Sequence, residues 1–183
     1  ENDHAHPRRT LPEDGIYTPN PRAPYVELGL FTCFSFLRGA SDAVDLAAEA
    51  WTQGYDALGC ADLNSLAGVV RLHTEAKKTR MRPIIGARIA LIGGETFLAY
   101  PRNRAAYGRL SRLISKGRTQ DPDGAWQAKG VCDLTLHDLA NHADGVQLIV
   151  VPPADLDRFA DDQPRLIRLL PTLKHIAASF LYR

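Results

Sequence analysis

From residue 25 onward, apolar positions follow strand spacing in some segments and helical spacing in others. Short apolar runs such as Val146–Val151 are typical of buried strands. Apolar residues at helical spacing, as at Val44, Ala47 and Trp51, predict helices with one buried stripe. These patterns predict strands at Tyr25–Thr32, Asp56–Ala61, Ile84–Ile92, Glu95–Tyr100, Val146–Val151 and His175–Tyr182, and helices at Asp42–Gln53, Ser65–Thr79, Asn103–Ser115, Thr135–Ala143 and Gln163–Leu170.

Local signals mark where several of these elements start, stop or turn. Ser41 is the expected N-cap of the first helix, and Gly54 suits its C-terminal stop. The pair Gly93-Gly94 predicts a two-residue hairpin between two strands. The stretch Thr119–Gly130 contains Asp-Pro-Asp-Gly and is expected to be a loop.

The order of elements predicts an α/β fold. Strands that alternate with helices favour a mainly parallel sheet or a (β/α) barrel. The last predicted element is a strand with no helix after it, so we expect an incomplete barrel and a fragment of a longer protein. Residues 25–183 would form this domain, whereas residues 1–24 contain five prolines and are expected to be an extended or disordered lead-in.

Composition narrows the protein class. The 183 residues are 45% hydrophobic and 23% charged, which suits one globular domain with a core. No apolar run approaches the ~20 residues of a membrane span. The three cysteines form no C-x-x-C pair, so reduced thiols in a cytoplasmic protein are expected. A net charge of +1 excludes electrostatic nucleic-acid binding by the chain as a whole.

Positive charge is concentrated in one segment, between Pro101 and Arg118, which contains no Asp or Glu. Arg109, Arg112 and Lys116 share one face of the predicted helix, because they are spaced at i, i+3 and i+7. That face could contact DNA phosphates or an acidic partner surface, or it could simply be the solvated side of an amphipathic helix. The candidate contact residues are Arg102, Arg104, Arg109, Arg112 and Lys116.

Five sequence blocks, in order, carry a resemblance to a known family. They are Phe34–Ser41, Asp62–Arg71, Pro83–Arg88, Arg104–Leu110 and Lys129–Leu136. Together they resemble the N-terminal PHP (polymerase and histidinol phosphatase) domain of bacterial C-family DNA polymerases. Within that group the chain is most similar to the error-prone, alpha-subunit-like (ImuC-type) polymerases. The resemblance implies a PHP-like (β/α) barrel, incomplete in this chain.

The same resemblance identifies positions where metal-binding members of the family carry ligands. The family's first motif places two histidines and then an acid before a glycine, the second places a histidine after an aspartate, and a glutamate follows later. None of the residues found at these positions is a ligand for a divalent cation. They are Gly29, Phe31, Arg38, Leu63 and Arg88. We therefore expect no catalytic residue and no metal in this chain.

The resemblance implies a non-catalytic scaffold within an error-prone polymerase that acts in translesion synthesis and DNA repair. Its Mg²⁺ would be held by polymerase domains that this chain does not contain. Its partners would be DNA, the sliding clamp and mutasome proteins, in the cytoplasm and away from membranes. Arg38 and Arg88 could still bind a phosphate oxyanion, although they cannot lower the pKa of a water as a metal does.

Two other functions stay open. The chain could be a divergent metal-dependent phosphoesterase or exonuclease with displaced ligands such as Asp62, His73 and His137. Asp62 could instead have a purely structural role, as a strand-end residue that caps the following turn or helix. The chain could instead be an interaction module that docks through the basic helix. Bound zinc or manganese would favour the phosphoesterase. Loss of partner binding after charge reversal at Arg109 and Arg112 would favour the interaction module.

Overall fold

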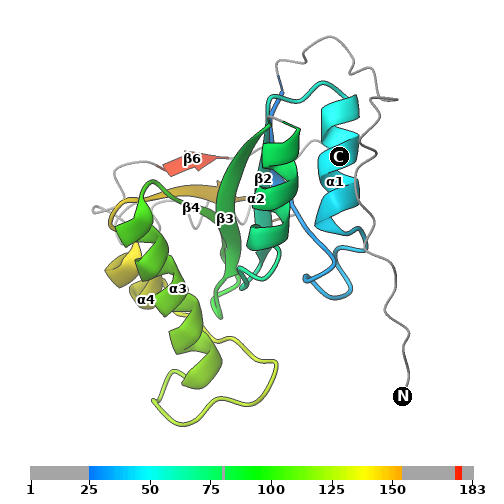
Figure 1. Cartoon of the computed structure of the whole chain (residues 1–183). Helices are drawn as coiled ribbons and strands as arrows, with labels where there is room; N and C mark the ends of the chain where they lie inside the picture. Colours follow the sequence, from blue (N-terminus) through cyan, green and yellow to red (C-terminus); the bar gives the residue numbers. More distant parts are fainter. Residues whose placement is uncertain (1–24, 80, 154–175, 179–183) are drawn as a thin grey trace, which may run out of the picture.

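In a computed structural model, residues 25–79, 81–153 and 176–178 are described (Figure 1). Their strands form one sheet in the order β1-β2-β3-β4-β5-β6. The strand boundaries are β1 (Glu27–Leu30), β2 (Ala57–Leu63), β3 (Arg82–Ala90), β4 (Thr96–Pro101), β5 (Val146–Val151) and β6 (Ile176–Ala178). The expected lead-in at residues 1–24 and the expected helix Gln163–Leu170 lie outside the described residues.

Four of the predicted helices are present, with shifted ends. They are α1 (Ala43–Thr52), α2 (Val69–Lys78), α3 (Arg104–Thr119) and α4 (Leu136–His142). The expected cap of α1 is wrong by one residue, because the side chain of Asp42, not Ser41, accepts a hydrogen bond from the Val44 amide. Among the helices of the described residues, none combines the length and apolar character that crossing a membrane requires.

The sheet is mainly parallel, as predicted, with one strand that runs against its neighbours. β1, β2 and β3 are parallel neighbours, and β5 pairs in parallel with β6, but β4 runs antiparallel to both β3 and β5. The cause is the hairpin between β3 and β4. It is longer than the two residues expected, since the Leu91 amide bonds to the Glu95 carbonyl and Gly94 adopts a left-handed φ of +95°.

All four helices cover the same face of the sheet. Along β3, Ile85 packs in the cluster under α1 and α2, whereas Ala87 and Ile89 pack in the cluster under α3 and α4. Residues two apart on a strand share a face, so both helix pairs lie on one side, as Figure 1 shows. Leu66 contacts both clusters and joins them into one layer.

The other face is free of these helices and is strongly curled. Tyr100 on β4 donates a hydrogen bond to the carbonyl of Leu28 on β1, three strands away. Its ring crosses β3 over Gly86, where a Cβ would lie 2.4 Å from the ring. The missing side chain at Gly86 therefore leaves room for the Tyr100 ring and allows the sheet to curl into a half-barrel.

Asp62 ties the loop after β1 to the end of β2. The residue is fully buried, and one carboxylate oxygen accepts hydrogen bonds from the Thr32 amide (2.8 Å) and the Ser35 hydroxyl (2.6 Å). The other accepts from the Thr32 hydroxyl at 2.8 Å and faces the Cys60 thiol at 3.6 Å. Ser35 also accepts from the Leu63 amide. Asp62 thus holds the preceding loop instead of capping the following turn.

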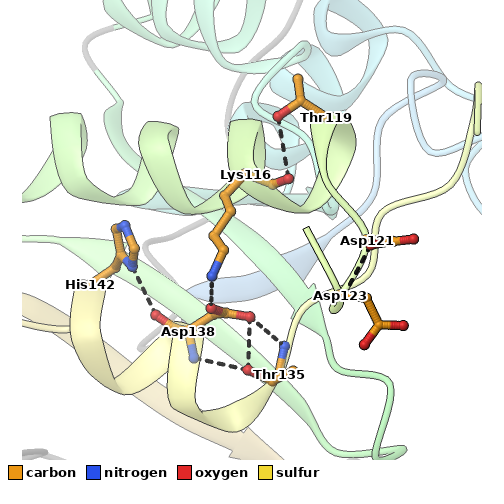
Figure 2. A network of polar contacts seen from close by, with 7 residues as sticks. All are labelled: Lys116, Thr119, Asp121, Asp123, Thr135, Asp138 and His142. Atoms are coloured by element: carbon orange, nitrogen blue, oxygen red, sulfur yellow. Dashed lines mark hydrogen bonds and ion pairs between the residues drawn. The ribbon is translucent and has the colours of Figure 1, made fainter. Parts of the chain in front are cut away.

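A second buried carboxylate joins α3 to α4 (Figure 2). Asp138 and Thr135 form a reciprocal capping box at the start of α4, and Lys116 of α3 donates a hydrogen bond to Asp138. Burial acts to raise the pKa of Asp138, but the hydrogen bonds from Lys116 and Thr135 outweigh it and hold the pKa below its ordinary value of 3.8. The contact fixes the packing of the two helices.

The substitution Asp62→Asn tests the tie between β1 and β2. An amide offers one acceptor where the carboxylate offers two, so we expect the free energy of unfolding to fall by about 3 kcal/mol. Thr32→Val removes only the hydroxyl and should cost about 1 kcal/mol. Urea denaturation measures both. The exposed Asp123→Asn is the control, and an equal loss in that variant would contradict this role for Asp62.

The substitution Asp138→Asn tests the α3–α4 contact and its pH dependence. We expect unfolding free energy to fall by about 2 kcal/mol at neutral pH. Because the folded-state pKa of Asp138 is depressed, this stability is present above about pH 4 and is lost as the pH falls through the folded pKa. Urea denaturation from pH 7 to pH 2.5 should show the wild type and variant converging.

The matched control is Asp144→Asn, which breaks the ion pair of Arg109 with Asp144, a carboxylate that is 86% exposed. A pair this exposed should contribute under about 1 kcal/mol. If the two substitutions cost the same, or if Asp138→Asn stays equally destabilising at pH 2.5, the assigned role of Asp138 is wrong.

Candidate functional site

The five positions at which the resemblance expects metal ligands gather near the carboxyl ends of β1, β2 and β3. Gly29 lies on β1, with Phe31 just after that strand. Leu63 ends β2, and its register partner is Arg88 on β3. Carboxyl ends of neighbouring parallel strands are where α/β folds place their ligand sites. The fifth position, Arg38, comes directly before Gly39 and is exposed on the loop that Asp62 holds.

The guanidinium of Arg88 occupies the centre of this group. Its Nη2 donates to the Gly29 carbonyl at 3.2 Å, and its Cζ lies 4.5 Å from the centroid of the Phe31 ring. A Cβ placed on Gly29 would be only 3.2 Å from Nη2. The glycine therefore leaves room for the guanidinium, and the phenylalanine supplies a π-face for it.

The electrostatics of Arg88 reflect its partial burial. Burial lowers the pKa of its guanidinium from the ordinary value, and the positive charge of Arg38 lowers it further. Tyr100 and the carboxylate of Glu27 oppose this shift. Arg88 stays protonated nonetheless, because an arginine pKa lies far above neutral. The site thus holds a fixed positive charge.

The residues present do not fit a divalent cation. At the positions that the resemblance marks, a glycine, a phenylalanine and a leucine offer no side-chain donor atom, and two arginines would repel the ion. Two carboxylates are nearby, and the oxygens of both already accept hydrogen bonds. Asp62 accepts from Thr32 and Ser35, and Glu27 accepts from the Gly29 amide and the Tyr25 hydroxyl. These residues therefore support no metal-dependent chemical step.

The displaced-ligand set of the phosphoesterase alternative is spread over separate elements. Asp62 is on β2, half-buried His73 on α2 and exposed His137 on α4. Across residues 25–79, 81–153 and 176–178, no three His, Cys, Asp or Glu side chains gather closely enough to hold a metal ion. The described structure does not bring the three together.

Much of the basic segment is engaged inside the domain. Arg109 pairs with Asp144 at 2.7 Å, and Lys116 pairs with Asp138. Arg102 donates to the Gln147 side chain at 3.3 Å. The remaining two candidates, Arg104 and Arg112, are exposed, and neither side chain forms an ion pair within the described part of the chain.

Sequence reasoning missed the residues that shape the site around Arg88. Glu27 lies close enough for its charge to act on Arg88, and its carboxylate accepts from the Gly29 amide and the Tyr25 hydroxyl. The hydroxyls of Thr32 and Ser35 position the loop. In the sequence, Thr32 shows only as a polar residue at the end of a predicted strand. That signal does not reveal that its partner is Asp62, 30 residues away.

Comparison with known proteins places this geometry in a family. The model of the PHP domain matches residues 28–170 of the chain. Two solved structures share the fold. One is a candidate metal-dependent phosphoesterase from Bifidobacterium adolescentis, with a TM-score of 0.56 at 11% identity, over 87% of this chain and 88% of that one. The other is an amidohydrolase from Chromobacterium violaceum, with a TM-score of 0.56 at 13% identity, over 84% and 75%.

Curated relatives are more similar in sequence. The error-prone DNA polymerase of Caulobacter vibrioides is 41% identical over 86% of this chain, and that of Allorhizobium ampelinum is 38% identical over 84%. Error-prone DNA polymerase 3 of Agrobacterium fabrum is 44% identical over 72%. The chain spans only 12% to 14% of the length of these relatives. The chain therefore belongs to the PHP domain family, and it is similar over most of its length to error-prone DNA polymerases.

Proposed function

We propose that this chain is a non-catalytic PHP domain that serves as a scaffold within an error-prone DNA polymerase, with its metal site lost. One observation carries the proposal. The Arg88 guanidinium sits against Gly29 and Phe31, where the resemblance expects three metal ligands. A cation would have to displace a like charge that is packed against an aromatic ring.

The loss of metal removes the chemistry of the site. Phosphoester hydrolysis by metal centres depends on a bound cation that activates water and neutralises phosphate charge. A guanidinium can bind and neutralise an oxyanion, but it stays protonated and cannot generate hydroxide at neutral pH. The fold still supplies a curled sheet with helices on one face. That is a support for neighbouring domains and not a hydrolytic centre.

The remaining properties of the parent protein belong to the same proposal. The curated relatives are error-prone DNA polymerases, so the whole protein would extend DNA past lesions with Mg²⁺ held in its polymerase domains. It would contact DNA, the sliding clamp and mutasome proteins in the cytoplasm. The interaction-module alternative is weakened, because Arg109 and Lys116 already pair within the domain.

The first test measures metal content and hydrolysis. The purified chain is incubated with Zn²⁺ or Mn²⁺, desalted and analysed by mass spectrometry for metals, and a 3′-labelled oligonucleotide reports nuclease activity. We expect far less than one metal per chain and no EDTA-sensitive cleavage, because the marked positions lack donor atoms. Bound metal near one per chain together with manganese-dependent cleavage would overturn the proposal in favour of the phosphoesterase alternative.

The second test is a double-mutant cycle between Gly29→His and Arg88→Ala. A histidine at position 29 would collide with the guanidinium, since even its Cβ would lie 3.2 Å from Nη2. Urea denaturation should show that Gly29→His destabilises the domain, and that Arg88→Ala recovers about 1 kcal/mol of the loss.

The matched control is the same cycle with Arg82→Ala, an exposed arginine on the same strand. It should show no coupling with Gly29→His, because residues without shared contacts act additively. Zero coupling with Arg88→Ala, or equal coupling with both arginines, would mean that the guanidinium does not occupy the space over Gly29.

A further inference from the structure

The loop between β1 and α1, drawn in blue in Figure 1, carries three exposed large apolar side chains, and its segment Phe34–Leu37 is called the apolar loop below. Phe36 is 84% exposed, Leu37 is 90% exposed and Phe34 is 43% exposed. Single exposed apolar residues are common on protein surfaces. Three of them within four positions form a patch, and exposed apolar patches mark sites of interaction.

Hydrogen bonds fix the backbone of the apolar loop. The amides of Arg38 and Gly39 both donate to the Ser35 carbonyl at 2.9 Å. The Ser35 hydroxyl in turn donates to the buried Asp62 carboxylate. A Cβ on Gly39 would lie 2.3 Å from the Thr32 carbonyl oxygen, so the two ends of the loop are packed closely together. A loop that is already ordered loses little conformational entropy when a partner binds, which favours association.

Leu37 has a strained backbone in addition to an exposed side chain. Its φ of +61° lies in the left-handed region, where the Cβ of an L-residue crowds the backbone. Glycine or asparagine adopts this conformation at lower cost. The leucine gains little burial in return, because its side chain is almost fully exposed. Strained residues are concentrated where function requires them, so this position indicates a use for the side chain outside the domain.

Positive charge borders the apolar loop. Arg38 follows Leu37 directly, is exposed and forms no ion pair within the described residues. Arg71 of α2 lies with its Cζ 5.5 Å from the centroid of the Phe34 ring, and its side chain is 54% exposed. Arg71 pairs with Asp42 at 2.9 Å, so these two arginines and one carboxylate leave a net positive border. A complementary surface is therefore apolar at its centre and acidic at its edge.

We propose that the apolar loop is the surface on which a polymerase domain of the same parent chain docks, through an apolar patch edged by carboxylates. The chain spans only 12% to 14% of the length of its curated relatives, so a parent of that length offers ample surface to cover the loop. An aliphatic leucine suits a protein partner better than DNA, because it cannot stack on a base or donate a hydrogen bond. This inference rests on the proposed function and deepens it, since it names the surface through which the scaffold acts.

Hydroxyl-radical footprinting read by mass spectrometry tests the proposal, because the radical oxidises side chains according to their exposure to water. It is applied to the 183-residue chain and to the intact parent polymerase. We expect Phe36 and Leu37 to react readily in the chain and about fivefold more slowly in the parent, where the docked domain covers them. Phe97 is fully buried and is the internal control, since it should stay unreactive in both proteins while the domain is folded.

Other occupants of the apolar loop give different footprints. Protection that appears in the 183-residue chain alone, and rises with its concentration, would mean that a second copy covers the loop. Protection in the parent only after DNA is added would mean that nucleic acid covers it. Either result overturns the inference, as does equal reactivity of Phe36 in the chain and the parent. None of these outcomes involves bound metal, which is the result that would overturn the metal-free scaffold instead.

The substitution Leu37→Asn separates docking from a role in folding. Asparagine tolerates a left-handed backbone, so the urea midpoint of the 183-residue chain should stay equal or rise. In the parent the same substitution removes an apolar anchor, and Phe36 should become about threefold more reactive. Ile92→Asn, at an apolar position that is 56% exposed outside the loop, is the matched control and should leave Phe36 protected. If Leu37→Asn also leaves Phe36 fully protected in the parent, the docking role of this loop is wrong.

Discussion

The contact on which this account depends is the packing of one positive charge into a space left by a missing side chain. Arg88 reaches from β3 to the carbonyl of Gly29 and lies over the ring of Phe31. The three residue types depend on one another for this contact. Without the glycine the guanidinium would lack room, and without the aromatic ring its partial burial would have less compensation.

Around this contact, hydrogen bonds from polar side chains hold the fold together. Asp62, which could be taken for a remaining metal ligand, is fully buried and bonded to the loop after β1. Tyr100 crosses Gly86 and links β4 to β1, which keeps the sheet curled. The carboxyl ends of the parallel strands are thereby brought together, as in other barrels of this class. This arrangement is compatible with the proposed scaffold role.

Local patterns predicted most elements of the fold. The buried run Val146–Val151 was located to the residue, and helix α3 was found from its apolar stripe, although it extends four residues further. The predicted hairpin at Gly93-Gly94 accounts for the antiparallel pairing of β3 with β4, whereas no local pattern indicated that β4 also pairs antiparallel with β5. The Asp42 cap was missed because Ser41 beside it is an equally good cap by residue type.

The residues of the site could be identified from the sequence, but their arrangement in space could not. The resemblance identified the five positions without ligands, yet nothing local indicates that Arg88 crosses to Gly29, 59 residues away in sequence. The same holds for Arg109 and Lys116, whose acidic partners lie 35 and 22 residues further along the chain. Helical spacing showed that these basic residues share a face, but only the packing of α4 shows that acids meet them.

The most direct measurement of the central claim is the response of the Arg88 Nε–H resonance to Mn²⁺. A paramagnetic ion bound among Gly29, Phe31 and Leu63 would broaden that resonance at one equivalent. Because the guanidinium of Arg88 fills this space, stoichiometric Mn²⁺ should leave the line width of its Nε–H resonance unchanged from the value measured with EDTA. Selective broadening at Arg88, reversed by EDTA, would contradict the account.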